Sequence, residues 1–148
     1  MGADLYINSL PDETRRGGFE VSKEAVKSGY FRDCYNGWGL FAIMSATLDE
    51  TISWWQIFYK KKWFSTKNNS TMTSKGCKKF WEWMEPKIEK FLKKRKFYRY
   101  DYEKWGGDPI KKEITEPDDI AAIKEHAKLF REFYKYAIEL KSTVDWFV

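Results

Sequence analysis

Hydrophobic residues recur at helical spacing in three parts of the chain. From 38 to 59 they predict two consecutive helices with a break near Thr47, because Thr47 and Glu50 fit the capping box that begins a helix. The segments 73–96 and 117–141 each predict one helix with a single apolar stripe. Acidic residues follow Pro117, so this first turn would complement the helix dipole.

The helix expected over 73–96 has three faces when its residues are projected at about 100° each. The core face gathers apolar side chains: Cys77, Phe80, Trp81, Met84, Ile88, Phe91 and Leu92. A second arc carries cations around an indole: Lys79, Trp83, Lys87, Lys90 and Lys94. A third arc mixes the two charges: Lys78, Glu82, Glu85, Glu89 and Lys93. Pro86 lies inside this pattern and should kink the helix or split it in two.

Apolar and polar residues alternate near both ends of the chain. Residues 3–8 therefore predict a strand, and 144–148 predict a terminal strand that would pair with it. Residues 97–105 alternate aromatic and charged side chains and form a third candidate strand, whereas 11–18 reads as a polar loop. We expect a mainly helical α+β fold in a single domain (1–148), with three or four helices packed on a small sheet formed by the N- and C-terminal strands.

Composition favours a folded protein in a reducing compartment. The chain has 148 residues, 43% hydrophobic and 33% charged, which is enough apolar material for a core. No apolar run approaches the roughly 18 residues that span a bilayer, and the first residues lack the pattern of a signal peptide. Cys34 and Cys77 belong to no metal or disulfide motif and read as buried thiols. We expect a cytoplasmic protein that does not contact a membrane.

Positive charge is concentrated in one segment. Between Lys60 and Arg99, fourteen Lys and Arg accompany three Glu, so this segment carries a net charge of +11. The rest of the chain has thirteen cations and nineteen anions, a net charge of −6. Such an asymmetry lets one surface attract a polyanion although the whole molecule is only mildly basic.

The cationic arc of the long helix is the first candidate site, for nucleic acid or for an acidic partner protein. Arg95 and the run Lys60–Lys62 could extend its field. Lysines along a helix can follow a phosphate backbone, and Trp83 could stack on an unpaired base. The alternative is a solvated helix face with Trp83 packed on a neighbouring loop. The candidate binding residues are Lys79, Trp83, Lys87, Lys90, Lys94 and Arg95.

The stretch 29–36, G-Y-F-R-D-C-Y-N, is the second candidate site. Arg32 and Asp33 could form an ion pair that fixes this stretch as a loop, with Trp54 and Trp55 as a lid or floor. The functional interpretation is a polar-aromatic pocket for a small molecule, and the alternative is a buried network that closes the fold. The candidate pocket residues are Tyr30, Arg32, Asp33, Tyr35, Asn36, Trp54 and Trp55.

Motifs of catalysis are weak in this sequence. His126 is the only histidine and has no identifiable carboxylate or nucleophile partner, so a structural role is the more usual interpretation. The acid pairs Asp49-Glu50 and Asp118-Asp119 stand where helices are expected to start, so helix capping accounts for them. No phosphate-binding glycine loop, nucleophile elbow or zinc spacing occurs. We therefore expect no catalytic residues, no metal and no cofactor.

Three separated pieces of the chain resemble a group of small uncharacterised phage and prophage proteins. The pieces are M-G-A-D-L-Y-I (1–7), G-Y-F-R-D-x-Y-N (29–36) and S-W-W (53–55), with Cys34 and Ile52 where the group usually has Ser and Leu. The resemblance implies a virus infecting bacteria as the context and no catalytic residues. It leads us to expect a non-enzymatic accessory protein in the cytoplasm of a bacterial host cell, which binds and could inhibit a host or defence-system protein. The alternatives are nucleic-acid binding by the 79–94 face and small-molecule binding near Arg32.

Overall fold

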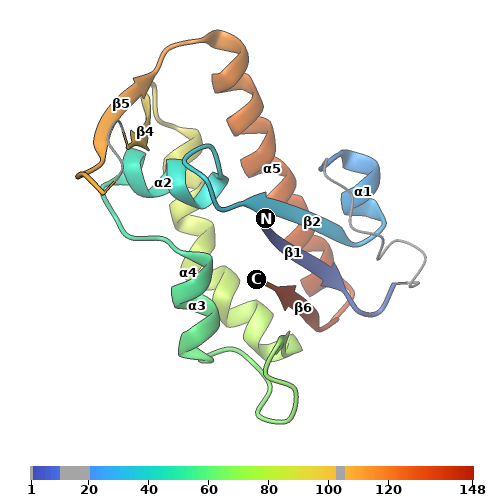
Figure 1. Ribbon diagram of the computed structural model, residues 1–148. Coiled ribbons are helices and arrows are strands. Elements are labelled where there is room, and N and C mark those ends of the chain that lie inside the picture. The colour runs from blue at the N-terminus through green and yellow to red at the C-terminus, as the bar shows by residue number, and fades with distance from the viewer. Residues whose placement is uncertain (1, 11–20, 103–105) are drawn as a thin grey trace.

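The computed structural model describes residues 2–10, 21–102 and 106–148 (Figure 1), so the loop expected over 11–18 lies outside the described residues. The elements in chain order are β1 (Gly2–Ile7), α1 (Lys23–Lys27), β2 (Tyr30–Cys34), α2 (Leu40–Leu48), α3 (Trp54–Lys60), β3 (Thr71–Met72), α4 (Ser74–Leu92), β4 (Phe97–Asp101), β5 (Ile110–Ile114), α5 (Pro117–Glu139) and β6 (Val144–Phe147). This arrangement confirms the predicted α+β fold.

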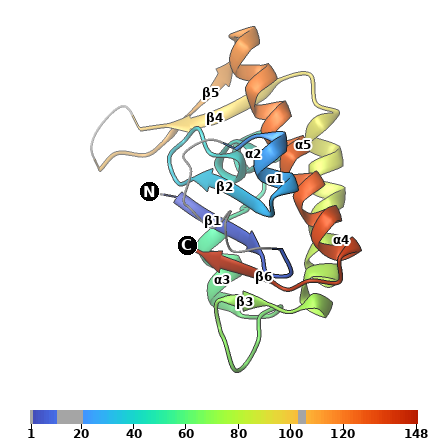
Figure 2. The ribbon, with the colours of Figure 1, turned by 90° about the vertical axis from the view of Figure 1, so that its right-hand side faces the viewer.

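The main sheet has four antiparallel strands in the order β2-β1-β6-β3. The predicted pairing of the N- and C-terminal strands is confirmed, since β1 pairs with β6 and places Leu5 opposite Trp146. On its other edge β1 pairs with β2 and places Leu5 opposite Phe31. All three side chains are buried because they share the face of the sheet that the long helices α4 and α5 cover (Figure 2).

The stretch 29–36 is not the loop that the sequence suggested, because its central residues form strand β2. Phe31 and Asp33 face the core, whereas Arg32 lies on the opposite face beside Asp4. A strand was hard to recognise here because one of its two inward positions holds a carboxylate. Only the end of the stretch turns, where Asn36 Oδ1 accepts a hydrogen bond from the Trp38 amide at 2.9 Å.

The break between the two central helices falls close to the predicted position, but the predicted capping box is wrong. Thr47 lies inside α2, and its hydroxyl accepts a hydrogen bond from the Tyr98 amide at 3.0 Å. Asp49 ends α2 with φ of 52°, and Ser53 caps α3 instead. The later helix α4 begins after Thr73, whose hydroxyl caps it, and it runs through Pro86 without being split.

Strands β4 and β5 form a separate two-stranded sheet, whose outer end extends away from the main body in Figure 2. The strand predicted over 97–105 is observed as far as Asp101, and residues 103–105 lie outside the described part of the chain. Phe97 anchors β4 by contacting Phe91 of α4, with ring centroids 5.1 Å apart. The sheet therefore packs on the helices and does not extend the terminal sheet.

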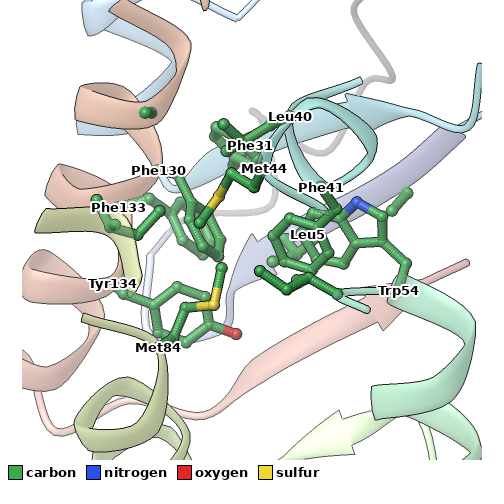
Figure 3. Packing of buried hydrophobic residues seen from close by; sticks show 14 of the residues in the cluster. Leu5, Phe31, Leu40, Phe41, Met44, Trp54, Met84, Phe130, Phe133 and Tyr134 are labelled. Carbon is green, nitrogen blue, oxygen red and sulfur yellow. The ribbon is translucent and has the colours of Figure 1, made fainter. Parts of the chain in front are cut away.

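Aromatic side chains fill the core between the main sheet and the helices (Figure 3). Phe130 of α5 lies at its centre and contacts Phe31, Phe41 and Trp54. Trp54 stacks on Phe41, with ring centroids 3.8 Å apart and an interplanar angle of 3°. Each buried aromatic ring of this kind contributes about 1.5–3 kcal/mol relative to an exposed one, so aromatic burial is a main source of stability.

Candidate functional site

Helix α4 has the core face that the sequence predicted, and two of its three glutamates lie beside α5. Arg131 of α5 donates to Glu89 at 2.8 Å, and this bond lowers the pKa of the Glu89 carboxyl. Glu85 accepts a hydrogen bond from the Trp81 indole at 2.8 Å and lies 3.9 Å from the Lys135 ammonium of α5. Two of the three carboxylates of α4 are thus engaged away from the cationic arc.

The predicted cations of α4 have different surroundings. Lys87 is hydrogen-bonded to Glu50, the second residue after α2, so its charge is already compensated. Lys79 and Lys90 are exposed, and neither forms an ion pair with a carboxylate of the described residues. Since α4 ends at Leu92, Lys94 and Arg95 follow the helix and do not continue its regular face.

Trp83 is packed on a neighbouring segment, as the structural alternative predicted, yet it remains 37% exposed. The ring centroids of Trp83 and Trp63 are 5.7 Å apart, and the Lys87 ammonium lies 4.7 Å from the Trp83 centroid. The Lys62 ammonium lies 5.4 Å from the Trp63 ring. This packing brings the basic run after α3 next to α4. We call Lys62, Lys79, Trp83, Lys87 and Lys90 the basic surface.

The second candidate site divides into separate clusters. Arg32 donates to both Asp4 oxygens at 2.8 and 2.9 Å, so the expected Arg32–Asp33 ion pair is wrong. Neighbouring residues of a strand face opposite sides, which separates the two side chains. Tyr30 also donates to Asp4, and burial together with this carboxylate raises the pKa of the Tyr30 hydroxyl. Tyr30 and Arg32 therefore belong to the outer face of the sheet.

Asp33 forms the buried network that was the alternative to a pocket. Its carboxylate is 2% exposed and accepts hydrogen bonds from the Leu40 amide at 2.7 Å, the Phe41 amide at 3.2 Å and the Trp54 indole at 2.6 Å. Gly39, the N-cap of α2, has no side chain that could accept from these amides. Asp33 therefore caps α2 from a neighbouring strand and joins it to α3.

A cavity of about 350 Å³ lies between β2, α2 and α5, and two residues of the predicted pocket, Arg32 and Asp33, line it. Its lining includes Cys34, Trp38, Asp119 and His126. The His126 Nε2 atom is 3.4 Å from Asp33 Oδ1, but it is not aligned for a hydrogen bond and has no hydrogen-bond partner among the described residues. Asp33 already accepts three hydrogen bonds, so its carboxylate serves the fold. The sequence did not suggest the polar lining from α5, Asp119 and His126, because these residues are far from the stretch 29–36 along the chain.

Tyr35 and Trp55 form a third cluster, in which Trp55 is exposed and Tyr35 is partly buried. Their ring centroids are 5.5 Å apart, and Tyr59 stacks on Trp55 from one helical turn further along α3. Three residues of the predicted pocket, Tyr35, Trp54 and Trp55, line one hollow of about 210 Å³. Trp54 is buried and Trp55 is exposed, because consecutive helical residues point in different directions.

No protein-family model, curated protein or solved structure matches the chain. In the described residues, none of the helices has both the length and the apolar character needed to span a bilayer. The same residues contain no cluster of three or more His, Cys, Asp or Glu side chains that could hold a metal ion.

Proposed function

We propose that this protein binds nucleic acid through the basic surface. The observation that carries the proposal is the division of charge on α4, where Arg131 and Lys135 of α5 lie next to Glu89 and Glu85. The exposed lysines on the other side of the helix keep their charge available. A polyanion is the ligand that such a surface attracts most strongly.

The length of α4 suits a ligand with repeated charges. The helix has 19 residues, which at about 1.5 Å per residue extends over roughly 28 Å. Lys79 and Lys90 lie three turns apart on this helix, and Lys62 adds a cation from the segment after α3. Each phosphate that such a side chain neutralises releases a counterion, so binding should weaken steeply as salt concentration rises.

The test is the affinity of wild type and of Lys79→Glu/Lys90→Glu for labelled oligonucleotides across a salt series. We expect wild type to bind at low salt and the variant to lose at least tenfold in affinity, with a smaller salt dependence. Two lost phosphate contacts should reduce the slope of log K against log salt by about 1.4 to 1.8. Lys87 is left unchanged because a glutamate there would face Glu50.

The matched control is Lys23→Glu/Lys27→Glu, which changes the net charge equally at two exposed positions of α1. This control should bind nearly as well as wild type, because α1 and α4 lie in different parts of the molecule (Figure 1). Equal losses in both variants would mean that net charge and not the basic surface governs binding. Absence of wild-type binding at low salt would refute the proposal.

A protein partner is the second candidate, favoured by one surface cluster. Trp38 is 47% exposed, and the Arg99 guanidinium lies 4.6 Å from the centroid of its ring. Trp and Arg dominate the energetics of many protein interfaces. Affinity purification from a bacterial lysate should then recover a stoichiometric protein with wild type but not with Trp38→Ala/Arg99→Ala. Recovery of no such protein with wild type would contradict this candidate.

A further inference from the structure

Helix α3 presents an aromatic pair to solvent, whereas most large aromatic side chains of the described residues lie in the core. Trp55 is 38% exposed and Tyr59 is 66% exposed. Their ring centroids are 5.5 Å apart with an interplanar angle of 19°, so the two rings form a nearly parallel pair. Tyr35 contacts the Trp55 ring and supports it from the neighbouring turn. The pair is therefore held in place before any ligand arrives.

The segment of the chain that carries this pair is cationic and contains no carboxylate. From Thr51 to Trp81 the chain contains no Asp or Glu and seven Lys. Lys60 borders a shallow hollow of about 420 Å³ together with Trp55, Gln56 and Tyr59.

A continuous run of sequence joins this pair to the basic surface. Lys61 is engaged internally, since its ammonium donates to the Asn69 carbonyl at 2.6 Å and lies 3.1 Å from the Phe58 ring centroid. Lys60 and Lys62, on either side of it, are exposed. Lys62 already belongs to the basic surface, so cations continue from the aromatic pair toward α4.

We propose that Trp55 and Tyr59 form a stacking platform for the unpaired bases of a single-stranded nucleic acid. Lys60 would contact the adjacent phosphates, and the strand would continue over the basic surface. Aromatic rings among lysines fit this ligand because every base has a flat face that can stack, whereas paired bases within a duplex hide those faces. The inference rests on the proposed function and names its ligand class, a single strand in preference to a duplex.

The experiment measures fluorescence anisotropy of labelled oligothymidine and of a labelled duplex of equal length at one low salt concentration. The platform variant is Trp55→Ala/Tyr59→Ala, and Trp55→Phe/Tyr59→Phe is the conservative variant that keeps flat rings. The matched control is Tyr102→Ala, since Tyr102 is 66% exposed, as Tyr59 is, but lies after β4. Far-UV circular dichroism verifies that every variant is folded.

We expect wild type to prefer the single strand. The alanine variant should lose at least about fivefold in affinity for it, which is the lower limit for one unstacked base. Its affinity for the duplex should change less than twofold. The phenylalanine variant should retain most of the single-strand affinity, and Tyr102→Ala should retain all of it.

The outcomes separate this inference from the proposed function. If the alanine variant binds both ligands as wild type does, the platform is wrong while nucleic-acid binding stands. Equal losses for both ligands also overturn the platform, because stacking must discriminate between them. If the alanine variant loses the single strand but Lys79→Glu/Lys90→Glu does not, the platform stands and the role of α4 falls. If wild type binds neither ligand, both proposals fail.

Discussion

Substitution of Asp33 by Ala tests how much of the fold depends on one buried carboxylate. Asp33 accepts hydrogen bonds from two amides at the start of α2 and from the Trp54 indole of α3. The change to Ala leaves three buried N–H groups without an acceptor. It should therefore disconnect strand β2 from two helices at once.

The magnitude follows from these three donors. A buried donor without an acceptor costs about 1–3 kcal/mol, so three donors give roughly 3–9 kcal/mol. The substitution also removes a buried charge, and the relief of its desolvation acts in the opposite direction. We therefore expect the lower end of this range, a decrease of about 3 kcal/mol in the free energy of unfolding. This is a large part of the roughly 5–15 kcal/mol by which a typical domain is stable. Asp33→Asn keeps one carbonyl oxygen and should lose less, about 1–2 kcal/mol.

The assay is urea denaturation followed by circular dichroism and tryptophan fluorescence. Asp118→Ala is the control, because it removes an exposed carboxylate near the start of α5 and should cost no more than about 1 kcal/mol. If the free energy of unfolding of Asp33→Ala lies within about 1 kcal/mol of the wild-type value, the hydrogen bonds to Asp33 do not hold the two helices in place.

Three further predictions concern pH, thiol reactivity and packing. The Arg131 guanidinium lowers the pKa of Glu89, so this pair stabilises the fold above the ordinary glutamate pKa and loses its effect as pH falls. In urea denaturation, Arg131→Ala should lower the free energy of unfolding by less than about 1 kcal/mol at neutral pH, because the pair is partly exposed, and this difference from wild type should vanish in acid. A difference that persists in acid would contradict the stabilising role of the Arg131–Glu89 pair. Burial raises the pKa of the Cys77 thiol to about 12, so the native protein at pH 8 should leave Cys77 unmodified by a disulfide reagent, while half-buried Cys34 reacts first. Equal native rates for both thiols would show that Cys77 is accessible. A Cβ added at Gly76 would lie 2.0 Å from a backbone oxygen, so Gly76→Ala should lower the free energy of unfolding by more than about 1 kcal/mol, although Ala normally favours a helix; a stabilised variant would refute this.

The long helices and terminal strands could be predicted because their side chains repeat with one clear period. Helix α4 shows this best, since its buried residues form one arc of the projection. Strand β2 escaped prediction because Asp33 occupies an inward position, where a nonpolar residue is usual. Strand β5 escaped for a different reason: it is largely exposed and carries Lys and Glu between its two Ile residues.

The candidate sites could be predicted only as far as local geometry reaches. The cationic arc of α4 follows from helical periodicity, but Glu50, which pairs with Lys87, and Arg131, which pairs with Glu89 on the mixed arc, come from other parts of the chain. The alternation of β2 sends Arg32 and Asp33 of the predicted pocket to opposite faces of the sheet, whereas Tyr35, Trp54 and Trp55 line one hollow. Trp55 and Tyr59 are one helical turn apart, so the bounds of α3 alone are enough to place their side chains on the same face of the helix.

The position of β1 inside the main sheet has a consequence for how the chain acquires its structure. Its two neighbours come from very different places in sequence, since β2 follows within about thirty residues and β6 is the last described element. During synthesis, one edge of β1 must stay unpaired until nearly all of the described chain has left the ribosome. Closing so large a loop is slow, so the helices are expected to form before the sheet is completed, and the exposed edge of β1 is where premature association between nascent chains would begin.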